Sequence, residues 1–257
     1  MDLELTNKRV LITGSSKGIG LAIAEHFLRE GASVVISSRG EEKLTAAKEQ
    51  LSAQYDATKI HAFSCDFAIT EAVAQLADKV ESALNGIDIV VSNIGDGRSV
   101  PDALPESDQW DKVWSSNFDT ALFSARAFLP MLEKSQGNLL FISSITAKEA
   151  FGAPVDYSTA KTAVTALAKN MARKLGGTVR VNVLAPGNVY FEGGSWDDKI
   201  KADESRVKNI IQSTVPMNRF GTPDEIADAA LFICSNRAAF MTGSVVVVDG
   251  GQTVGIF

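Results

Sequence analysis

The stretch Val10-Leu11-Ile12-Thr13-Gly14-Ser15-Ser16-Lys17-Gly18-Ile19-Gly20 joins a short apolar run to a glycine-rich turn and to the start of a helical pattern. The apolar run predicts a strand, and residues 19–29 predict a helix. Glycines at 14, 18 and 20 allow a tight turn and let a pyrophosphate approach the backbone, where a helix N-terminus stabilises its charge. The stretch therefore predicts the first strand, loop and helix of a dinucleotide-binding fold, and the turn at residues 14–20 predicts cofactor contacts.

The same turn also satisfies the pattern G-x-S-x-G, in which Ser16 would be the nucleophile of a hydrolase. That chemistry needs an Asp or Glu, and then a His, further along the chain. The last histidine is His61, which is too early for this order. A hydrolase is therefore disfavoured.

Short apolar runs alternate with helical patterns along the whole chain. The predicted strands are residues 10–12, 34–36, 60–63, 89–91, 139–142, 179–184 and 245–248. Helical patterns cover residues 19–29, 42–54, 71–85, 108–132, 157–175 and 224–235. The strands are apolar on both faces, as in a parallel sheet buried between layers of helices. This alternation predicts an α/β Rossmann fold, a doubly wound seven-stranded parallel sheet with helices on both faces, and residues 1–257 are expected to form a single domain.

The composition argues against several classes of protein. Apolar residues make up 45% and charged residues 22% of the chain, which is ordinary for a globular protein. The net charge of −6 argues against a nucleic-acid or membrane partner. Two histidines and two distant cysteines, Cys65 and Cys234, match no metal spacing and predict buried, reduced thiols. The N-terminus lacks the pattern of a signal peptide and no apolar run approaches about 20 residues, so a cytoplasmic protein is expected.

The end of the second predicted strand discriminates between the two nicotinamide dinucleotides. An NAD enzyme places an Asp or Glu about 20 residues past the loop to hold the ribose 2′-hydroxyl. Here the sequence is Ser37-Ser38-Arg39, and the first acid that follows is Glu41. Arg39 can fork onto a 2′-phosphate, and Lys17 is expected to supply a second cation. The sequence therefore predicts contacts from Ser38 and Arg39 and a preference for NADP(H) over NAD(H).

Tyr157 and Lys161 lie one turn apart on the helix predicted at residues 157–175, so they share one face. A tyrosine has a pKa of about 10 and is a poor proton carrier at neutral pH. A cation about 4 Å away, at an effective dielectric of about 20, would stabilise the phenolate by roughly 4 kcal/mol, or about three pKa units. The pair therefore predicts a general acid or base whose pKa Lys161 lowers toward neutral.

Further motifs follow in order, and together they resemble the short-chain dehydrogenase/reductase family over nearly the whole chain. These motifs are Thr13-Gly14-x-x-x-Gly18-x-Gly20, Cys65-Asp66-Phe67, Ser92-Asn93-Ile94-Gly95, Ser116-Asn117-Phe118, Ile142-Ser143-Ser144-Ile145, Tyr157-x-x-x-Lys161, Val181-Asn182-Val183-Leu184-Ala185-Pro186-Gly187 and Val248-Asp249-Gly250-Gly251. The chain looks most similar to members of the 3-oxoacyl-carrier-protein reductase type, a label that covers many carbonyl reductases. The spacing of Tyr157 and Lys161 argues against the enoyl-reductase branch, which has a longer gap.

The resemblance implies an oxidoreductase that moves hydride between a nicotinamide and a carbonyl or secondary alcohol. Tyr157 would donate the proton, and Ser144 would hydrogen-bond the substrate oxygen. Lys161 would hold the nicotinamide ribose, and Asn117 would keep a water in line with it as a proton relay. The resemblance also implies an Asp66 contact to the adenine amino group, and further cofactor contacts from Phe67, Asn93, Gly95, Tyr157, Lys161, Pro186, Gly187 and Val189.

Some positions depart from the family pattern. Ser92 and Ile94 replace the usual Asn and Ala, and Phe191 stands where the family commonly has a threonine, which changes the expected contact to the nicotinamide carboxamide. Residues 190–215 interrupt the strand–helix alternation with a Gly-Gly pair and a polar helical stretch. They predict a mobile substrate flap with Trp196 exposed, and an ordinary surface excursion is the alternative.

The expected pocket is lined by residues 93–100, residues 144–154 and the flap, with few fixed charges. It favours a carbonyl compound with an apolar body, including a 3-oxoacyl thioester, over a sugar. The resemblance implies a homotetramer, or a homodimer, built through helices 108–132 and 157–175 and the last strand. One alternative is an NAD-dependent sugar or steroid alcohol dehydrogenase. A second is a silent dinucleotide-sensing regulatory protein, which would typically lack Tyr157 or Lys161. A third is a methyltransferase, which would need neither Arg39 nor the catalytic tetrad of Asn117, Ser144, Tyr157 and Lys161.

Overall fold

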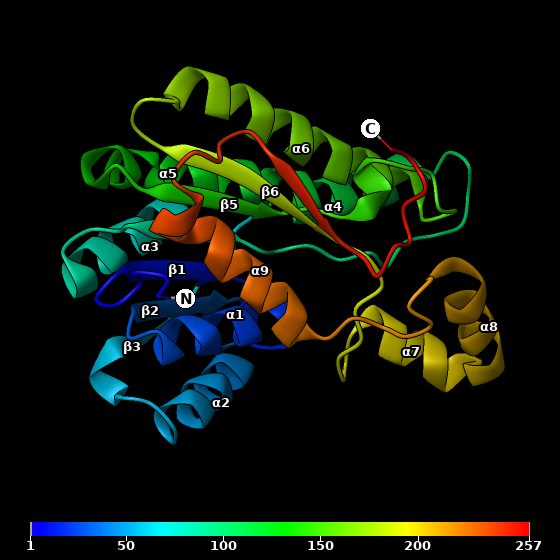
Figure 1. Cartoon of the computed structure of the whole chain (residues 1–257), viewed down its shortest axis with the longest axis horizontal. Coiled ribbons are helices and arrows are strands. Elements are labelled where there is room, and N and C mark those ends of the chain that lie inside the picture. The colour runs from blue at the N-terminus through cyan, green and yellow to red at the C-terminus, as the bar shows by residue number, and fades with distance from the viewer. Residues whose placement is uncertain (1, 257) are drawn as a thin grey trace.

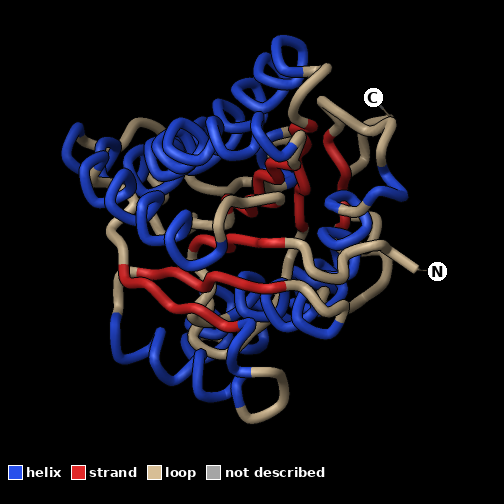
Figure 2. Tube along the Cα trace, turned by 90° about the vertical axis from the view of Figure 1, so that its left-hand side faces the viewer, coloured by secondary structure: helices blue, strands red, loops and turns tan. Residues whose placement is uncertain are grey.

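A β-sheet lies at the centre of the molecule, with helices on both sides of it (Figure 1, Figure 2). The computed structural model describes residues 2–256. Seven parallel strands lie in the order β3-β2-β1-β4-β5-β6-β7. Their bounds are β1 Arg9–Thr13, β2 Ser33–Ser38, β3 Ile60–Ser64, β4 Ile89–Ser92, β5 Asn138–Ile142, β6 Arg180–Pro186 and β7 Val245–Val248. The predicted doubly wound sheet is confirmed, and each predicted strand is present.

The direction in which the sheet grows reverses between β1 and β4. Val10 pairs with Val34 of β2 on one side and with Ile89 of β4 on the other. From this centre the chain adds strands outward to β3 in one direction and to β7 in the other. Connections that diverge from such a reversal leave a crevice beyond the carboxyl ends of the strands. The turn after β1 and the loop after β4 therefore face each other across the predicted ligand crevice.

Helices cover both faces of the sheet. Successive side chains of a strand point to opposite faces, so the hydrophobic core has two parts. Val10 and Ile12 pack with α1, α2 and α9, whereas Leu11 between them packs with α3, α5 and α6. None of the described helices is long and apolar enough to cross a membrane. Their bounds are α1 Gly18–Arg29, α2 Glu41–Ser52, α3 Thr70–Leu84, α4 Ser107–Trp114, α5 Thr120–Ser135, α6 Val155–Leu175, α7 Ser195–Ala202, α8 Glu204–Thr214 and α9 Pro223–Cys234.

Both cysteines are free and buried, as the sequence predicts. Burial raises the pKa of Cys65 to about 11 and that of Cys234 to about 12. Such thiols stay protonated at neutral pH and are poor nucleophiles.

The helix predicted over residues 108–132 is present without a break, and it contains a π-helical segment. α4 ends at Trp114, a π-helical segment covers Ser115–Asp119, and α5 begins at Thr120. Asn117 Nδ2 donates to the carbonyl oxygen of Val113 at 2.9 Å, and Ser116 Oγ donates to the same oxygen at 3.1 Å. Side-chain donors therefore replace the backbone amide that would continue the α-helical ladder. The widened turn holds Asn117 fully buried beside the loop that follows β4.

Residues 190–215 leave the alternation and form α7 and α8 beside the sheet (Figure 1). Val207, Ile211 and Val215 pack there into a separate cluster together with Trp196 and Phe220. The indole of Trp196 is half-buried and meets Phe220 edge-on, with 5.3 Å between ring centroids. The expectation that Trp196 is exposed is therefore wrong, because this segment has a small hydrophobic core of its own.

The start of α9 generates a test of local stability. Thr222 Oγ1 accepts from the amide of Glu225 at 3.3 Å, and the Glu225 carboxylate accepts from the amide of Thr222 at 2.9 Å. We expect Thr222→Ala to lower the free energy of unfolding by about 1 kcal/mol, because a helix amide loses its acceptor. Urea unfolding measures the change, and Thr222→Ser, which keeps the acceptor, should unfold close to wild type. Equal midpoints for wild type and Thr222→Ala would refute this role of the cap.

Candidate active site

The four residues of the expected tetrad approach one another at the carboxyl edge of the sheet. Tyr157 and Lys161 lie in the first two turns of α6, and Ser144 follows β5. Lys161 Nζ is 6.0 Å from the centroid of the Tyr157 ring and donates to the carbonyl oxygen of Ile142 at 3.1 Å. The Ser144 side chain lies close enough to the Tyr157 phenol to lower its pKa, and its Oγ accepts from the amide of Thr146 at 3.2 Å. Asn117 reaches the same place from the π-helical segment.

Gly95 shows how closely these groups meet. A Cβ atom added at Gly95 would lie 2.5 Å from Lys161 Nζ and 2.9 Å from Asn117 Oδ1. A Cβ at Gly97 would touch the Tyr157 ring at 3.7 Å, which is ordinary contact. The loop after β4 therefore passes directly over the tetrad, and at Gly95 only hydrogen fits.

Burial controls the acidity of Tyr157. It raises the pKa of the phenol, the Ser144 side chain lowers it in part, and the charge of Asp96 raises it further. The expectation that Lys161 lowers this pKa is not met in this structure. The ammonium lies 6.0 Å from the ring centroid, and burial of the phenol outweighs the lowering of the pKa that was expected from its charge. Burial also lowers the pKa of Lys161 itself to about 8.

The Asn117 amide is held at both ends by the backbone of one residue. Its Oδ1 accepts from the amide of Asp96 at 3.1 Å, and its Nδ2 donates to the carbonyl oxygen of Asp96 at 3.1 Å. Asn117 therefore fixes the loop after β4 above Lys161. The proton relay expected of Asn117 stays a prediction.

The turn after β1 suits a pyrophosphate. Lys17 occupies the N-cap position of α1 with extended backbone, and within the described chain no side-chain cap or first-turn acid occupies that helix end. Gly14 and Gly18 have φ values of +64° and +57°, which favour glycine. Asn93 Nδ2 donates to the carbonyl oxygens of Thr13 and Gly14, which joins this turn to the loop after β4. The amides and positive end of α1 thus fit the phosphates of a dinucleotide.

The adenosine side of the crevice contains an unsatisfied hydroxyl. Ser38 Oγ is buried and has no hydrogen-bond partner among residues 2–256, and the neighbouring Arg39 is exposed. Both fit a ribose that carries a 2′-phosphate. Asp66 Oδ1 accepts from the amide of Ala68 at 3.0 Å, which leaves Oδ2 for an adenine amino group. Phe67 is 1% exposed and its ring lies in the core, so only its backbone can reach a cofactor.

The predicted nicotinamide side is built by the end of β6. Gly221 N donates to Asn188 O at 2.9 Å, and Tyr190 N donates to Gly221 O at 3.1 Å. In this pairing the amide and carbonyl of Val189 point to the opposite edge, where a carboxamide could bind them. Asn188 Nδ2 is buried and unpartnered within the described residues, a polar group that sequence reasoning missed. Pro186 and Gly187 precede it, and a Cβ at Gly187 would lie 2.7 Å from Asp249 Cβ.

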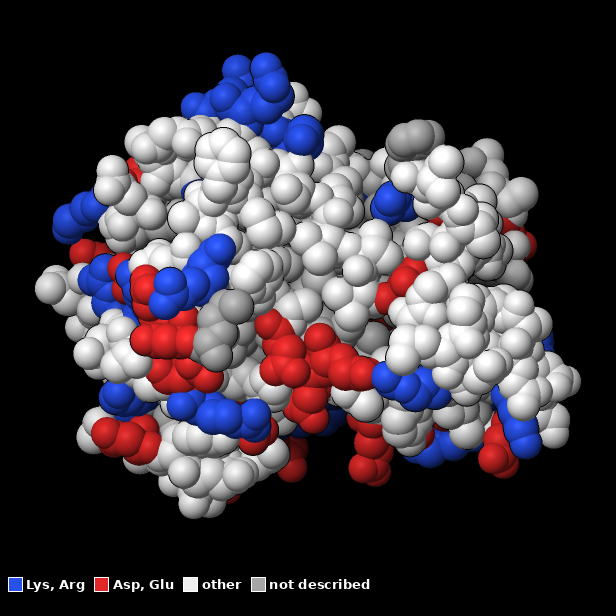
Figure 3. Space-filling view, in the orientation of Figure 1, with Lys and Arg blue, Asp and Glu red and all other residues white. Residues whose placement is uncertain are grey.

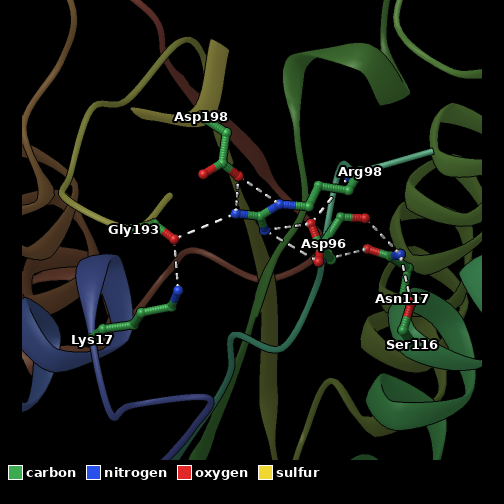
Figure 4. Close-up of polar contacts among 7 residues, drawn as sticks. All are labelled: Lys17, Asp96, Arg98, Ser116, Asn117, Gly193 and Asp198. Atoms are coloured by element: carbon green, nitrogen blue, oxygen red, sulfur yellow. Dashed lines mark hydrogen bonds and ion pairs between the residues drawn. The ribbon is translucent and has the colours of Figure 1, made fainter. Parts of the chain in front are cut away.

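The Lys17 ammonium points away from the expected 2′-phosphate position. Its Nζ donates to the carbonyl oxygen of Gly193, in the predicted flap, at 2.7 Å (Figure 4). The contact of Lys17 with the cofactor stays a prediction, and it would require Lys17 to leave Gly193. Lys17 meets Gly193 because the flap lies over the turn. A Cβ at Gly18 would lie only 2.6 Å from the ring of Phe191, the residue that replaces the family threonine.

Charged side chains also line the mouth of the crevice, where few were expected. Arg98 lies between Asp96 and Asp198, and its guanidinium reaches the Gly193 carbonyl (Figure 4). Nothing in the sequence indicates this cluster, apart from the presence of Arg98 in a segment predicted to line the pocket. One of its partners, Asp198, comes from α7, 100 residues further on.

A buried carboxylate beside Tyr157 was also missed. Asp156 is 1% exposed, and its Oδ1 accepts from the amide of Tyr157 at 2.7 Å. Its Oδ2 accepts from the hydroxyl of Ser99, which in turn accepts from Gln109 Nε2 at 3.1 Å. The network ties α4 and the loop after β4 to the start of α6. Among the described residues, no cluster of three or more metal-ligating side chains is present.

Comparisons with known proteins agree with this geometry. A family model described as enoyl-(acyl carrier protein) reductase matches residues 14–253. The 3-oxoacyl-[acyl-carrier-protein] reductase of Aquifex aeolicus is 30% identical over 98% of this chain and 100% of its own. Dehydrogenase/reductase SDR family member 4 of Oryctolagus cuniculus is 34% identical over 96% of this chain and 94% of its own. The crystal structure of L-sorbose reductase from Gluconobacter frateurii, complexed with NADPH and L-sorbose, is 30% identical with a TM-score of 0.90 and covers 99% of this chain and 100% of its own.

Burial of Lys161 predicts a pH-dependent stability. Its folded pKa of about 8 lies below the ordinary value of 10.5, so the unfolded chain binds more protons between these values and stability rises with pH there. At pH 7 both states are protonated and the full cost of the buried charge is present. We expect Lys161→Met to raise the free energy of unfolding at pH 7 by about 2 kcal/mol, after loss of the hydrogen bond to Ile142, and to lose most of this gain by pH 10.

Urea unfolding at pH 7 and pH 10 measures this difference. Lys174→Met, at the exposed end of the same helix, is the matched control and should change stability little at either pH. A Lys161→Met chain that is less stable than wild type at pH 7 would contradict the assignment.

Proposed function

The chain belongs to the short-chain dehydrogenase/reductase family, and we propose that it is an NADP(H)-dependent oxidoreductase that reduces a carbonyl compound or oxidises the corresponding secondary alcohol. One observation carries the proposal. The Tyr157 phenol, the Ser144 hydroxyl and the Lys161 ammonium meet beside an uncapped helix N-terminus that suits a pyrophosphate.

Tyr157 would donate the proton in the reductive direction. NADPH, when bound, would supply the hydride to the carbonyl carbon. Because burial raises its pKa, the phenol stays protonated at neutral pH and is ready to act as an acid. Ser144, whose side chain lies near the phenol, would bind the same carbonyl oxygen and orient it. The raised pKa of Tyr157 favours reduction over oxidation at neutral pH.

Lys161 and Asn117 would return the proton to Tyr157. With a pKa of about 8, Lys161 is mostly charged at pH 7 and can exchange a proton near that pH. Its ammonium would also hold the nicotinamide ribose. Asn117 Oδ1 and Lys161 Nζ both lie within 3 Å of the position that a Cβ atom of Gly95 would take, so the two groups are close neighbours.

Ser38 and Arg39 support NADP(H) over NAD(H). β2 ends without the carboxylate that would hold a 2′-hydroxyl and repel a 2′-phosphate. The buried, unpartnered Ser38 hydroxyl and the exposed Arg39 are the groups that would receive the phosphate. NADPH is bound in the similar L-sorbose reductase structure, which is consistent with this preference.

The substrate is proposed to be a neutral carbonyl compound with a polar portion. The charges at the crevice mouth pair with one another, so they present dipoles and not a free cation. A 3-oxoacyl thioester stays a candidate because of the Aquifex relative, and a sugar-type ketone because of the L-sorbose reductase. Basic side chains gather over the end of α6, which includes Arg173 and Lys174 in its last turn, and could dock an acidic carrier (Figure 3).

Two further expectations stay predictions. A homotetramer, or a homodimer, would cover α5, α6 and the free edge of β7, near which Val245, Phe240 and Val254 are exposed. A cytoplasmic location also stays a prediction. A silent dinucleotide sensor is disfavoured because Tyr157 and Lys161 are both present in the crevice.

The first test is turnover. We expect wild type to oxidise NADPH with at least one member of a carbonyl panel that includes acetoacetyl thioester, diketones, aromatic aldehydes, ketosteroids and ketoses. Tyr157→Phe should lower kcat by about 10² to 10⁴ because it removes the proton donor, and should bind NADPH as wild type does. Tyr55→Phe, on the far side of α1, is the control. A Tyr157→Phe enzyme with a near-wild-type rate would sink the proposal.

The cofactor preference has its own test. Arg39→Ala should weaken NADPH binding by about 10- to 100-fold, because a charge-assisted hydrogen bond is lost, and should leave NADH binding nearly unchanged. Fluorescence titration of both cofactors measures the two Kd values. Lys48→Ala, an exposed cation on α2, is the matched charge control. Equal losses for NADPH and NADH would mean that Arg39 does not read the 2′-phosphate.

A further inference from the structure

The carbonyl oxygen of Gly193 receives two cations that come from different loops. Lys17, in the turn after β1, donates to it at 2.7 Å. Arg98 Nη2, from the loop after β4, lies 3.4 Å from the same oxygen. Figure 4 shows both side chains reaching the Gly193 carbonyl oxygen, from different directions. Gly193 thus joins the two walls of the crevice.

Arg98 extends this junction along the flap. Its Nε and Nη2 donate to one oxygen of Asp198, in α7, at 2.9 and 2.6 Å. Its Nη1 and its own amide donate to Asp96 Oδ1 at 3.1 and 3.0 Å. The guanidinium therefore has carboxylates on two sides, one from its own loop and one from the flap.

Asp96 connects Arg98 to the tetrad. The amide and the carbonyl of Asp96 hold the two ends of the Asn117 side chain. Asn117 Oδ1 in turn lies beside Gly95 and Lys161 Nζ. A continuous series of contacts therefore runs from Asp198 in the flap, through Arg98 and Asp96, to the groups that would move the proton.

An isolated exposed ion pair contributes little to the stability of a fold. Arg98 differs because its planar fork engages two carboxylates and a carbonyl at once, which restricts the conformation of the loop. Its side chain is 47% exposed, so solvent weakens each contact but leaves the geometry intact. The effect of Arg98 is therefore expected in the alignment of the site and not mainly in global stability.

Resting on the proposed function, we propose that Arg98 is a positioning residue that couples closure of the flap over the phosphate turn to the placement of Asn117. When Asp198 and the Gly193 carbonyl engage Arg98, the loop that carries Asp96 is held in the form that grips Asn117. Cofactor retention and proton transfer are thereby linked through one side chain. When the flap is open, Arg98 keeps Asp96 but loses Asp198 and Gly193, and the loop has greater freedom.

The first experiment measures cofactor release and turnover together. Stopped-flow fluorescence gives the dissociation rate of NADPH, and steady-state kinetics give kcat and KM. Arg98→Ala should raise the NADPH dissociation rate and lower kcat, each by about 5- to 30-fold, and Asp198→Asn should shift both in the same direction by less than about fivefold. Arg98→Lys, which keeps the charge but loses the fork, should fall between Arg98→Ala and wild type.

Arg237→Ala is the matched control. It removes an exposed arginine that pairs with Glu4 at 2.8 Å, away from the crevice. It should leave the NADPH dissociation rate and kcat within about twofold of wild type, because a pair of this kind contributes little.

The second experiment asks whether Arg98 acts through Asn117. In an Asn117→Ala background, Arg98→Ala should lower kcat no further, whereas it should still raise the NADPH dissociation rate. If Asn117→Ala does not fold, Asn117→Ser provides the background, since its hydroxyl can still reach Val113 but cannot span both groups of Asp96.

Three results would overturn the proposal. Unchanged NADPH release and kcat in Arg98→Ala, with only a lower thermal midpoint, would make Arg98 a stabilising residue and nothing more. Faster release with an unchanged kcat would mean that Arg98 holds the flap over the cofactor but is not coupled to the placement of Asn117. Independent, multiplicative effects of Arg98→Ala and Asn117→Ala would place its action elsewhere. Failure of wild type to bind NADPH or to turn over would instead refute the proposed function, which these variants do not test.

Discussion

The close passage of one backbone segment over α6 organises this molecule. At Gly95 the loop after β4 lies so near Lys161 and Asn117 that even a Cβ atom would meet both within 3 Å. The same loop is tied to the phosphate turn through Asn93 and to the tetrad through Asp96. Because these bonds belong to one short segment, that segment fixes the position of the phosphate turn relative to the proton-transfer groups. A crevice formed by the reversal of the sheet becomes a candidate active site only through this contact.

The crowding that brings the tetrad together also removes it from water. Burial disfavours charge on both partners, so it raises the pKa of Tyr157 and lowers the pKa of Lys161 to about 8. Coulomb attraction considered alone predicts the opposite direction for Tyr157. Desolvation is the largest influence on the phenol, while the ammonium of Lys161 donates to the carbonyl of Ile142. The result is a protonated phenol, which suits the donation of a proton to a carbonyl oxygen.

The flap contacts the crevice more through polar groups than through apolar ones. α7 and α8 have a small core of their own, around Trp196 and Phe220. Their contacts to the crevice are made by Phe191 against Gly18, and by the Gly193 carbonyl and Asp198 with Lys17 and Arg98. Exposed ion pairs break and re-form at a small cost in free energy. Separation of such a surface from the crevice would therefore carry no large hydrophobic penalty.

The sequence by itself determined the seven-stranded sheet, the phosphate turn, the buried thiols and the order in which the tetrad residues occur. These features are local, since apolar period, glycine spacing and residues one helical turn apart are readable within a few positions. Only the tertiary structure decided the partners of Lys17, Arg98, Asp156 and Trp196, the π-helical turn at Asn117 and the direction of the Tyr157 pKa. Lys17 meets Gly193 across 176 residues and Arg98 meets Asp198 across 100. A long charged side chain has many rotamers of similar energy, so its partner depends on which distant loops the fold places beside it. Burial, likewise, belongs to the assembled crevice and not to any stretch of the chain.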